Sequence, residues 1–210
     1  MIRILIVDDH DLVRHGLKRI FEETQLMRVV AEHDKGVDAL HWVRDNDCDV
    51  VVLDIAMPGR SGIEVLKQLR EEKPKLPILI LSNYTEDQYA VRLIKAGASG
   101  YLTKGCPSAI VVEAVRDLAE GNKYFSPAVL ELLAKELSMP EGKLPHETLS
   151  DREFQIFKLF ASAKTVTEIS VILNLSGKTI STYRARILEK LKLRNNAEMM
   201  QYAIENRLTQ

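Results

Sequence analysis

Acidic and basic side chains follow several short apolar runs, at positions where they could bind a cation and a phosphoryl group. Asp8 and Asp9 directly follow one run, Asp54 follows another, and Ser82 and Lys104 come after two later runs. Carboxylates that are brought together repel each other, and Mg²⁺ relieves this repulsion through oxygen ligands while also binding phosphate. A carboxylate nucleophile, a metal ion and a lysine are what in-line phosphoryl transfer to a carboxylate requires.

Each of these residues has a plainer interpretation when it is taken alone. An aspartate after a strand usually caps a turn or a helix. Lys104 would be a solvated surface lysine, Ser82 a turn residue, and Tyr101 a packing residue. They indicate a site only if the strands before them are neighbours in one sheet.

The first 120 residues repeat a short apolar run and an amphipathic helix about five times. Continuous apolar runs are typical of parallel strands that are buried on both faces. The alternation predicts an α/β, doubly wound, five-stranded parallel sheet, whose ligands bind at the carboxyl ends of the strands. The expected strands are Ile2–Val7, Arg28–Ala31, Val50–Leu53, Pro77–Leu81 and Gly100–Leu102.

Capping residues predict where several helices begin. A serine or threonine followed three residues later by Glu or Gln is typical of a helix start. Ser126 before Pro127 predicts a helix over Pro127–Leu137, and Met139–Thr148, with its prolines and glycine, is expected to be an exposed linker. The capping pairs are Ser61 and Glu64, Thr85 and Gln88, Ser150 and Glu153, and Thr165 and Glu168.

The tail from Leu149 predicts an all-α four-helix domain. The second and third helices are separated by three residues, which is the helix-turn-helix arrangement. The expected helices are Asp151–Ser162, Val166–Leu173, Gly177–Leu191 and Ala197–Asn206.

The third of these helices has an apolar face and a face suited to DNA. Small exposed residues allow close approach to base edges, and basic residues contact phosphates. An ordinary solvated helix is the plain alternative, but the short turn before it favours DNA binding. Ile180, Ile187, Leu188 and Leu191 are expected to be buried, and Lys178, Ser181, Thr182, Ala185 and Glu189 exposed.

Composition supports two modules in one chain of 210 residues. Residues 1–147 hold 19 Lys and Arg against 24 Asp and Glu, a formal charge of −5, whereas residues 148–210 hold 10 against 6, or +4.

The longest apolar runs have four residues, far short of the roughly 20 that a membrane span needs. The N-terminus lacks the features of a secretory signal. Cys48 and Cys106 lack zinc or haem spacing, so we expect a cytoplasmic protein in a reducing compartment.

Residues 1–120 resemble the receiver domain of bacterial two-component response regulators, which has a flavodoxin-like fold. The resemblance implies that Asp54 accepts a phosphoryl group from a sensor histidine kinase. It implies Mg²⁺ bound by Asp9, Asp54 and the backbone carbonyl of Ala56, with Asp8 contributing through water. Ser82 and Lys104 would contact the phosphoryl group, and Tyr101 would change its packing. The matching segments are Val7–His10, Leu53–Gly59, Ser61–Gly62, Leu81–Ser82, Lys95–Ala98 and Gly100–Lys104.

The tail contains the segments Leu149–Glu153, Glu168–Ser170, Leu173–Ser176, Lys178–Tyr183 and Ile187–Leu191. Through them, residues 149–208 resemble the four-helix output domain of the LuxR and NarL families. The DNA-binding domain would span residues 148–210, and residues 121–147 would be a helix and linker between the modules. The resemblance implies that Gly177–Leu191 is the recognition helix in the major groove. The last helix would be a dimer contact, with Tyr202 and Ile204 packing there. Ser181, Thr182 and Ala185 would face bases, and Lys178, Thr179, Arg184, Arg186 and also Tyr183 would contact phosphates.

The sequence departs from these families at a few positions. Gly105 follows Lys104 where many receivers have proline, and Ala163 stands where the output family usually has glycine. Val166–Thr167 replaces a polar pair, while Ala56 and Tyr84 resemble positions that control water access to an aspartyl-phosphate.

The favoured function is a transcription factor whose dimerisation and DNA binding are controlled by phosphorylation. One alternative is a phosphatase that forms an aspartyl-phosphate, but Ala56 stands where such an enzyme needs a second acid. The other is an adaptor whose tail binds protein. A steep loss of DNA affinity with added salt would favour DNA.

Overall fold

The computed structural model describes residues 1–57, 62–138, 144–206 and 208. The chain divides into an N-terminal unit, residues 1–134, and a C-terminal unit, residues 135–210, which are described separately. The N-terminal unit contains β1 (Ile2–Val7), α1 (Asp11–Glu23), β2 (Met27–His33), α2 (Gly36–Asp45), β3 (Val50–Leu53), α3 (Gly62–Glu72), β4 (Ile78–Ser82), α4 (Glu86–Lys95), β5 (Gly100–Thr103) and α5 (Ser108–Ala119), and α6 (Pro127–Ser138) begins in it.

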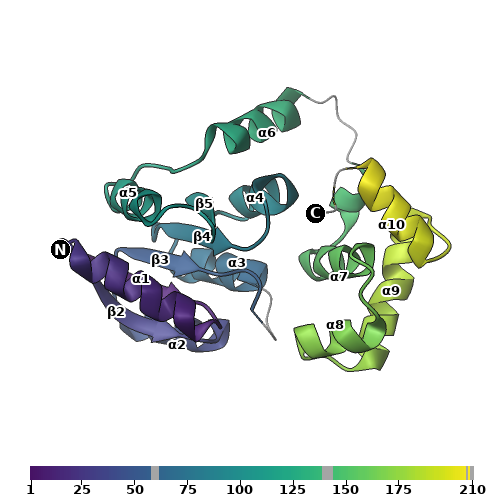
Figure 1. The fold of residues 1–210 in the computed structure, drawn as a ribbon, viewed down its shortest axis with the longest axis horizontal. Coiled ribbons are helices and arrows are strands. Elements are labelled where there is room, and N and C mark those ends of the chain that lie inside the picture. Colours follow the sequence, from purple (N-terminus) through teal and green to yellow (C-terminus); the bar gives the residue numbers. More distant parts are fainter. Residues whose placement is uncertain (58–61, 139–143, 207, 209–210) are drawn as a thin grey trace. The chain divides into compact units, whose positions relative to one another are not determined.

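The strands form one parallel sheet in the order β2-β1-β3-β4-β5 (Figure 1). This confirms the predicted α/β sheet and all five strands. β2 is longer than expected because the ladder with β1 continues through Glu32 and His33. Backbone hydrogen bonds extend this edge strand, and they do not require apolar side chains at Glu32 and His33.

Helices cover both faces of the sheet. On one face, Leu17 and Phe21 of α1 and Val115 of α5 pack on alternate strand residues such as Ile6 and Val52. The residues between them on the strands are also buried, and α2 and α3 pack against each other. Burial on both faces accounts for the uninterrupted apolar runs.

The outer edge of β5 is covered by the segment that follows α5. Tyr124 pairs with Gly100: its N–H donates to the Ser99 carbonyl at 3.1 Å, and its carbonyl accepts from the Tyr101 N–H at 3.4 Å. Ser126 then accepts a hydrogen bond from the Val129 N–H, as predicted for a helix cap, and donates to Glu86 Oε2 at 2.7 Å. The sheet edge is therefore paired with the protein's own chain.

The C-terminal unit is helical, as predicted. Both predicted capping boxes form, because Ser150 and Thr165 accept from the backbone of Glu153 and Glu168, whose carboxylates bind back. Its elements are the 3₁₀ helix η1 (Pro145–Thr148), α7 (Asp151–Ala161), α8 (Val166–Leu173), α9 (Gly177–Leu191) and α10 (Asn196–Glu205).

The predicted linker Met139–Thr148 is wrong in its last part, and its first part lies outside the described residues. Pro145–Thr148 is not exposed linker: it forms η1, and His146 is buried because its Nδ1 lies 3.0 Å from Tyr202 Oη and its ring lies beside Phe154. The rest of the predicted linker, residues 139–143, lies outside the described residues.

Of the predicted capping pairs in the N-terminal unit, one lies at the start of α4 and the other at the start of α3. α4 begins after Thr85 as predicted, but the Thr85 hydroxyl makes no capping bond. Ser61, the predicted cap of α3, lies outside the described residues. In the part of the chain that the structure describes, no helix is both long and apolar enough to cross a membrane.

Candidate functional site: an acidic pocket and a recognition helix

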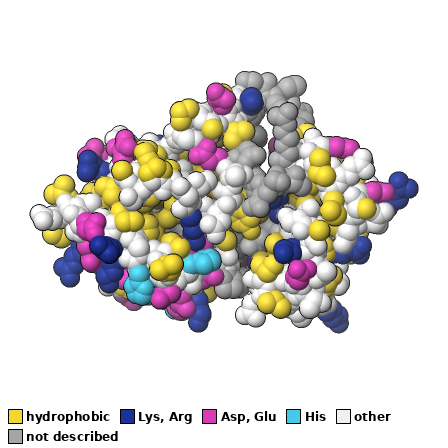
Figure 2. Space-filling view, viewed as in Figure 1, with side chains coloured by type: hydrophobic (Ala, Val, Ile, Leu, Met, Phe, Trp, Pro, Cys, Tyr) yellow, Lys and Arg dark blue, Asp and Glu magenta, His cyan; other side chains and the backbone are white. Residues whose placement is uncertain are grey.

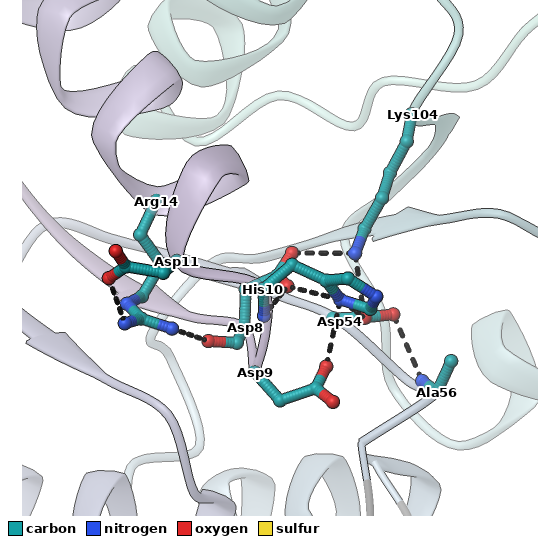
Figure 3. A network of polar contacts seen from close by, with 8 residues as sticks. All are labelled: Asp8, Asp9, His10, Asp11, Arg14, Asp54, Ala56 and Lys104. Carbon is teal, nitrogen blue, oxygen red and sulfur yellow. Dashed lines mark hydrogen bonds and ion pairs between the residues drawn. The ribbon is translucent and has the colours of Figure 1, made fainter. Parts of the chain in front are cut away.

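The sheet topology brings three strand ends together at its carboxyl edge (Figure 3). β1 pairs with β3 so that Val7 lies opposite Leu53. The residues that follow these two strands are therefore neighbours, and the Asp54 N–H donates to the Val7 carbonyl at 2.8 Å. Asp8 and Asp54 lie in the same pocket although they are 46 positions apart in the sequence.

Lys104 closes the pocket from the loop after β5. Its Nζ lies 2.7 Å from Asp54 Oδ2 and 2.7 Å from Asp8 Oδ2. Its backbone N–H donates to the Ser82 carbonyl at 2.8 Å, so the lysine keeps its place although Gly105 follows it. The other oxygen of Asp54 accepts from the Ala56 N–H at 2.9 Å. The structure thus places the carboxylates of Asp8 and Asp54 and the ammonium group of Lys104 together at one edge of the sheet.

Burial strongly affects the pKa values of Asp54 and Lys104. Asp54 is 1% exposed and Asp8 is 2% exposed. Burial raises the pKa of Asp54, and the charge and hydrogen bond of Lys104 only partly oppose that effect. Burial acts to lower the pKa of Lys104, but attraction to Asp54 and Asp8 outweighs it and the pKa is raised. The pocket therefore favours additional positive charge.

The donor set of the pocket fits a hard divalent cation. Asp8, Asp9, His10 and Asp54 each offer a ligand atom, and these atoms all lie within 4.8 Å of one another. Asp9 Oδ1 is buried and accepts no hydrogen bond from the described residues. A buried oxygen without a hydrogen-bond donor is suited to bind a metal ion. Carboxylate oxygens are the ligands that Mg²⁺ prefers.

Sequence reasoning missed His10, which lies at the rim of the pocket. Its Nδ1 is 2.9 Å from Asp9 Oδ1, 3.1 Å from Asp8 Oδ1 and 3.9 Å from Asp54 Oδ2. The available signal was its position, directly after two aspartates at a strand end. Arg14 supports the same turn by donating to the Asp8 carbonyl at 2.6 Å.

A chain of contacts connects the pocket to Tyr101. The fully buried Ser82 accepts a hydrogen bond from the Tyr84 N–H at 3.2 Å. Tyr101, also fully buried, donates from its hydroxyl to the Tyr84 carbonyl at 2.7 Å. Burial, and next the negative charge of Asp54, raise the pKa of Tyr84. Ser82 and Tyr101 therefore both bind the backbone of Tyr84, in the loop between β4 and α4.

In the C-terminal unit, α9 presents the predicted exposed face. Lys178, Ser181, Thr182, Ala185 and Arg186 are exposed, whereas Thr179, Tyr183 and Arg184 are partly buried. Figure 2 shows how basic side chains are distributed over the surface among polar and apolar ones.

The apolar face of α9 was predicted with one error. Ile180, Ile187 and Leu191 are buried, but Leu188 is only partly buried. Leu188 immediately follows the buried Ile187, and one residue along a helix turns the side chain by about 100°, toward the edge of the buried face.

Hydrogen bonds modify the predicted DNA contacts. Arg184 donates from Nε to Asn196 Oδ1 at 2.6 Å, so its guanidinium is held on α10. The hydroxyls of Ser181 and Thr182 donate back to the Gly177 and Lys178 carbonyls. Lys178 and Arg186 therefore offer the better exposed cations for phosphates.

Tyr202 does not fit the role of an exposed dimer contact. Its ring packs edge-on against Phe157 and His146 inside the C-terminal unit. Its hydroxyl lies at His146, which ties α10 to η1. Ile204, by contrast, is 64% exposed, so it is the residue of this pair that a second chain could contact.

An acidic pocket with a lysine at the carboxyl edge of a five-stranded parallel sheet, followed by a helix-turn-helix unit, defines the class of two-component response regulators. Comparison with known proteins gives the same result. Residues 4–141 match the response regulator receiver domain, and residues 147–203 match the bacterial regulatory proteins of the luxR family. The chain belongs to the NarL/FixJ family of response regulators, with a LuxR-type DNA-binding domain that regulates transcription.

Similar proteins cover nearly the whole chain. The response regulator UvrY of Escherichia coli is 38% identical over 99% of this chain and 96% of its own length. The response regulator GacA of Pseudomonas aeruginosa is 38% identical over 98% and 97%. Among solved structures, RcsB of Salmonella enterica serovar Typhimurium, bound to a promoter with the phosphomimetic BeF₃⁻, is 26% identical over 96% of this chain and 97% of that one, with a TM-score of 0.65.

Proposed function

We propose that a sensor histidine kinase phosphorylates Asp54 and that this modification controls dimerisation and sequence-specific DNA binding. One observation carries the proposal: the buried Asp54 carboxylate shares the Lys104 ammonium with Asp8, at 2.7 Å from each. A phosphoryl group on Asp54 adds negative charge and acceptor oxygens. Lys104 is already in place to bind them.

Asp9, Asp54 and the Ala56 carbonyl would hold Mg²⁺, with Asp8 contributing through water. When bound, the metal ion neutralises charge on the phosphoryl oxygens. Asp54 supplies the nucleophilic oxygen, Lys104 contacts the phosphoryl group, and Ser82 donates a hydrogen bond to it. For Ser82 to do so, its loop must move toward Asp54.

The contacts of Tyr84 support a route from this movement to the rest of the protein. Ser82 and Tyr101 both bind the backbone of Tyr84, so a displacement of the loop changes the packing of Tyr101. Coupling of this kind is typically worth about 1–3 kcal/mol, enough to shift a dimerisation equilibrium. RcsB, solved on a promoter with a phosphomimetic, supports a link between the phosphorylated state and DNA.

The two domains would divide the work, with residues 1–120 as receiver, 121–147 as helix and linker, and 148–210 as the DNA-binding domain. α9 would enter the major groove as the recognition helix, and two chains would read two half-sites. Ser181, Thr182 and Ala185 would face bases, with Lys178, Thr179, Tyr183, Arg184 and Arg186 contacting phosphates.

Phosphorylation by a small phosphodonor in the presence of Mg²⁺ tests the proposal. Mass spectrometry should find one phosphoryl group on the wild-type protein and none on Asp54→Asn, because the amide is not a nucleophile. Asp38→Asn is the matched control: Asp38 is exposed in the first turn of α2, and its substitution should leave phosphorylation unchanged. Modification of the Asp54→Asn protein at another residue would contradict the proposal.

A further inference from the structure

His10 brings a ring nitrogen to the centre of three carboxylates (Figure 3). Its Nδ1 lies 2.9, 3.1 and 3.9 Å from oxygens of Asp9, Asp8 and Asp54. The ring side chain is 51% exposed, whereas Asp8 and Asp54 are buried. His10 therefore stands between solvent and the floor of the pocket.

Hydrogen bonding alone does not account for this arrangement. An imidazole Nδ1 carries at most one hydrogen, and the Asp8 oxygen at 3.1 Å has suitable geometry to accept it. The Asp9 oxygen is closer, at 2.9 Å, yet it accepts no hydrogen bond from the described residues. One proton cannot serve three oxygens, whereas one cation can contact the nitrogen and the oxygens together.

The distances match those between ligands of one metal ion. Ligand atoms about 2.1 Å from an octahedral cation are separated by about 3.0 Å when adjacent and about 4.2 Å when opposite. The contact of Nδ1 with Asp9 Oδ1, at 2.9 Å, corresponds to adjacent ligands. The 3.9 Å separation from Asp54 Oδ2 is near the opposite arrangement.

The start of α1 fixes the backbone of His10. Its N–H donates to Asp8 Oδ1 at 2.9 Å, and its carbonyl accepts from the N–H groups of Val13 and Arg14 at 3.1 Å each. The ring consequently needs only side-chain rotation to adjust to a ligand.

We infer that His10 is a nitrogen ligand of the cation in the acidic pocket and that it shifts the preference of the site toward Co²⁺ and Ni²⁺ relative to Mg²⁺. The inference rests on the proposed function, since it assigns a further ligand to the same cation. Imidazole suits transition-metal cations, whereas Mg²⁺ prefers oxygen. An all-oxygen pocket would have a weaker transition-metal preference than this one.

Calorimetric titration of the unphosphorylated protein with Mg²⁺, Co²⁺ and Ni²⁺ at one pH tests the inference. His10→Gln should weaken Co²⁺ and Ni²⁺ binding about tenfold or more and change Mg²⁺ binding by less than about threefold. Equal weakening for all three cations, or no weakening, would overturn the inference. His15→Gln is the matched control, because His15 lies on α1 with an exposed side chain beside Asp11.

A spectroscopic measurement on the wild-type protein guards against a folding defect in the variant. Paramagnetic Co²⁺ should shift the NMR signals of the His10 ring strongly and leave those of His15 near their metal-free positions. Absence of a His10 shift at saturating Co²⁺ would refute ligation. If the His10 signals shift but Asp54 takes up no phosphoryl group with any cation, the proposed function is contradicted, whereas the inference that His10 binds the cation is supported.

Discussion

At the scale of the residue, Ala163 has a left-handed backbone conformation, which glycine adopts more readily than alanine. Its φ is 58°, in the left-handed region, in the turn after α7. A Cβ there costs about 1 kcal/mol, and glycine removes that cost. We therefore expect Ala163→Gly to raise the free energy of unfolding by about 0.5–1 kcal/mol, measured by urea denaturation.

A second alanine gives a matched control for this prediction. Ala185 lies exposed within α9, where glycine is less favourable than alanine by about 0.8–1 kcal/mol. Ala185→Gly should therefore destabilise the protein. Destabilisation by both substitutions would show that the backbone at Ala163 is not under strain.

Residue types and spacing were sufficient to predict the acidic pocket but not its full membership. Asp8 and Asp54 were predictable because they follow the neighbouring strands β1 and β3. Lys104 was predictable because the loop after β5 lies at the same carboxyl edge of the sheet. His10 was missed because side-chain direction at a helix start is not encoded in strand order. Arg184 binds Asn196, and a helical periodicity cannot show such a contact between helices.

At the scale of the element, an ion pair joins α2 to α3. Arg44 donates from Nε and Nη2 to the two carboxylate oxygens of Glu72, at 3.1 and 2.7 Å. The Arg44 hydrogen bonds, followed by that of Gln68, lower the pKa of Glu72 to about 2. The pair stabilises the packing of the two helices while Glu72 is ionised.

The lowered pKa sets the direction of a pH effect. The folded pKa lies below the unfolded value of about 4.3, so the stabilisation is present above pH 4.3 and is lost as the pH falls toward 2. Glu72→Gln should cost about 0.5–1 kcal/mol at pH 6, since the pair is solvent-screened, and much less at pH 2.5. Urea midpoints at both pH values measure this difference. Glu71→Gln, one position away and exposed, should show little change, and a Glu72→Gln cost that persists at pH 2.5 would contradict the assignment.

Element boundaries were predictable where local chemistry sets them. The boxes of Ser150 and Thr165 fixed the starts of α7 and α8, because each satisfies N–H groups within its own first turn. η1 was missed because its folding depends on packing of His146 against Phe154 and Tyr202. Proline-rich composition gave no sign of these distant partners.

At the scale of the whole molecule, the surface of α9 predicts how DNA binding responds to salt. Lys178→Ala and Arg186→Ala should each weaken binding to all sequences and reduce the salt slope by about one. Ser181→Ala and Thr182→Ala should alter sequence preference more than overall affinity. Titrations of labelled DNA at several salt concentrations measure both effects.

A charge change outside α9 provides the control for these titrations. Arg19→Ala removes the same charge from the exposed surface of α1 and should leave the slope unchanged. If Arg19→Ala reduces the slope as much as Lys178→Ala does, general charge and not α9 governs binding.

The pairing of Tyr124 with the margin of β5 bears on how this protein can be divided for study. A fragment that stops at residue 120 would leave the N–H of Tyr101 and the carbonyl of Ser99 without their backbone partners. Unprotected strand margins are templates for self-association. An isolated receiver domain therefore needs its chain to continue past Ser126, because aggregation of a shorter fragment would be mistaken for specific dimerisation.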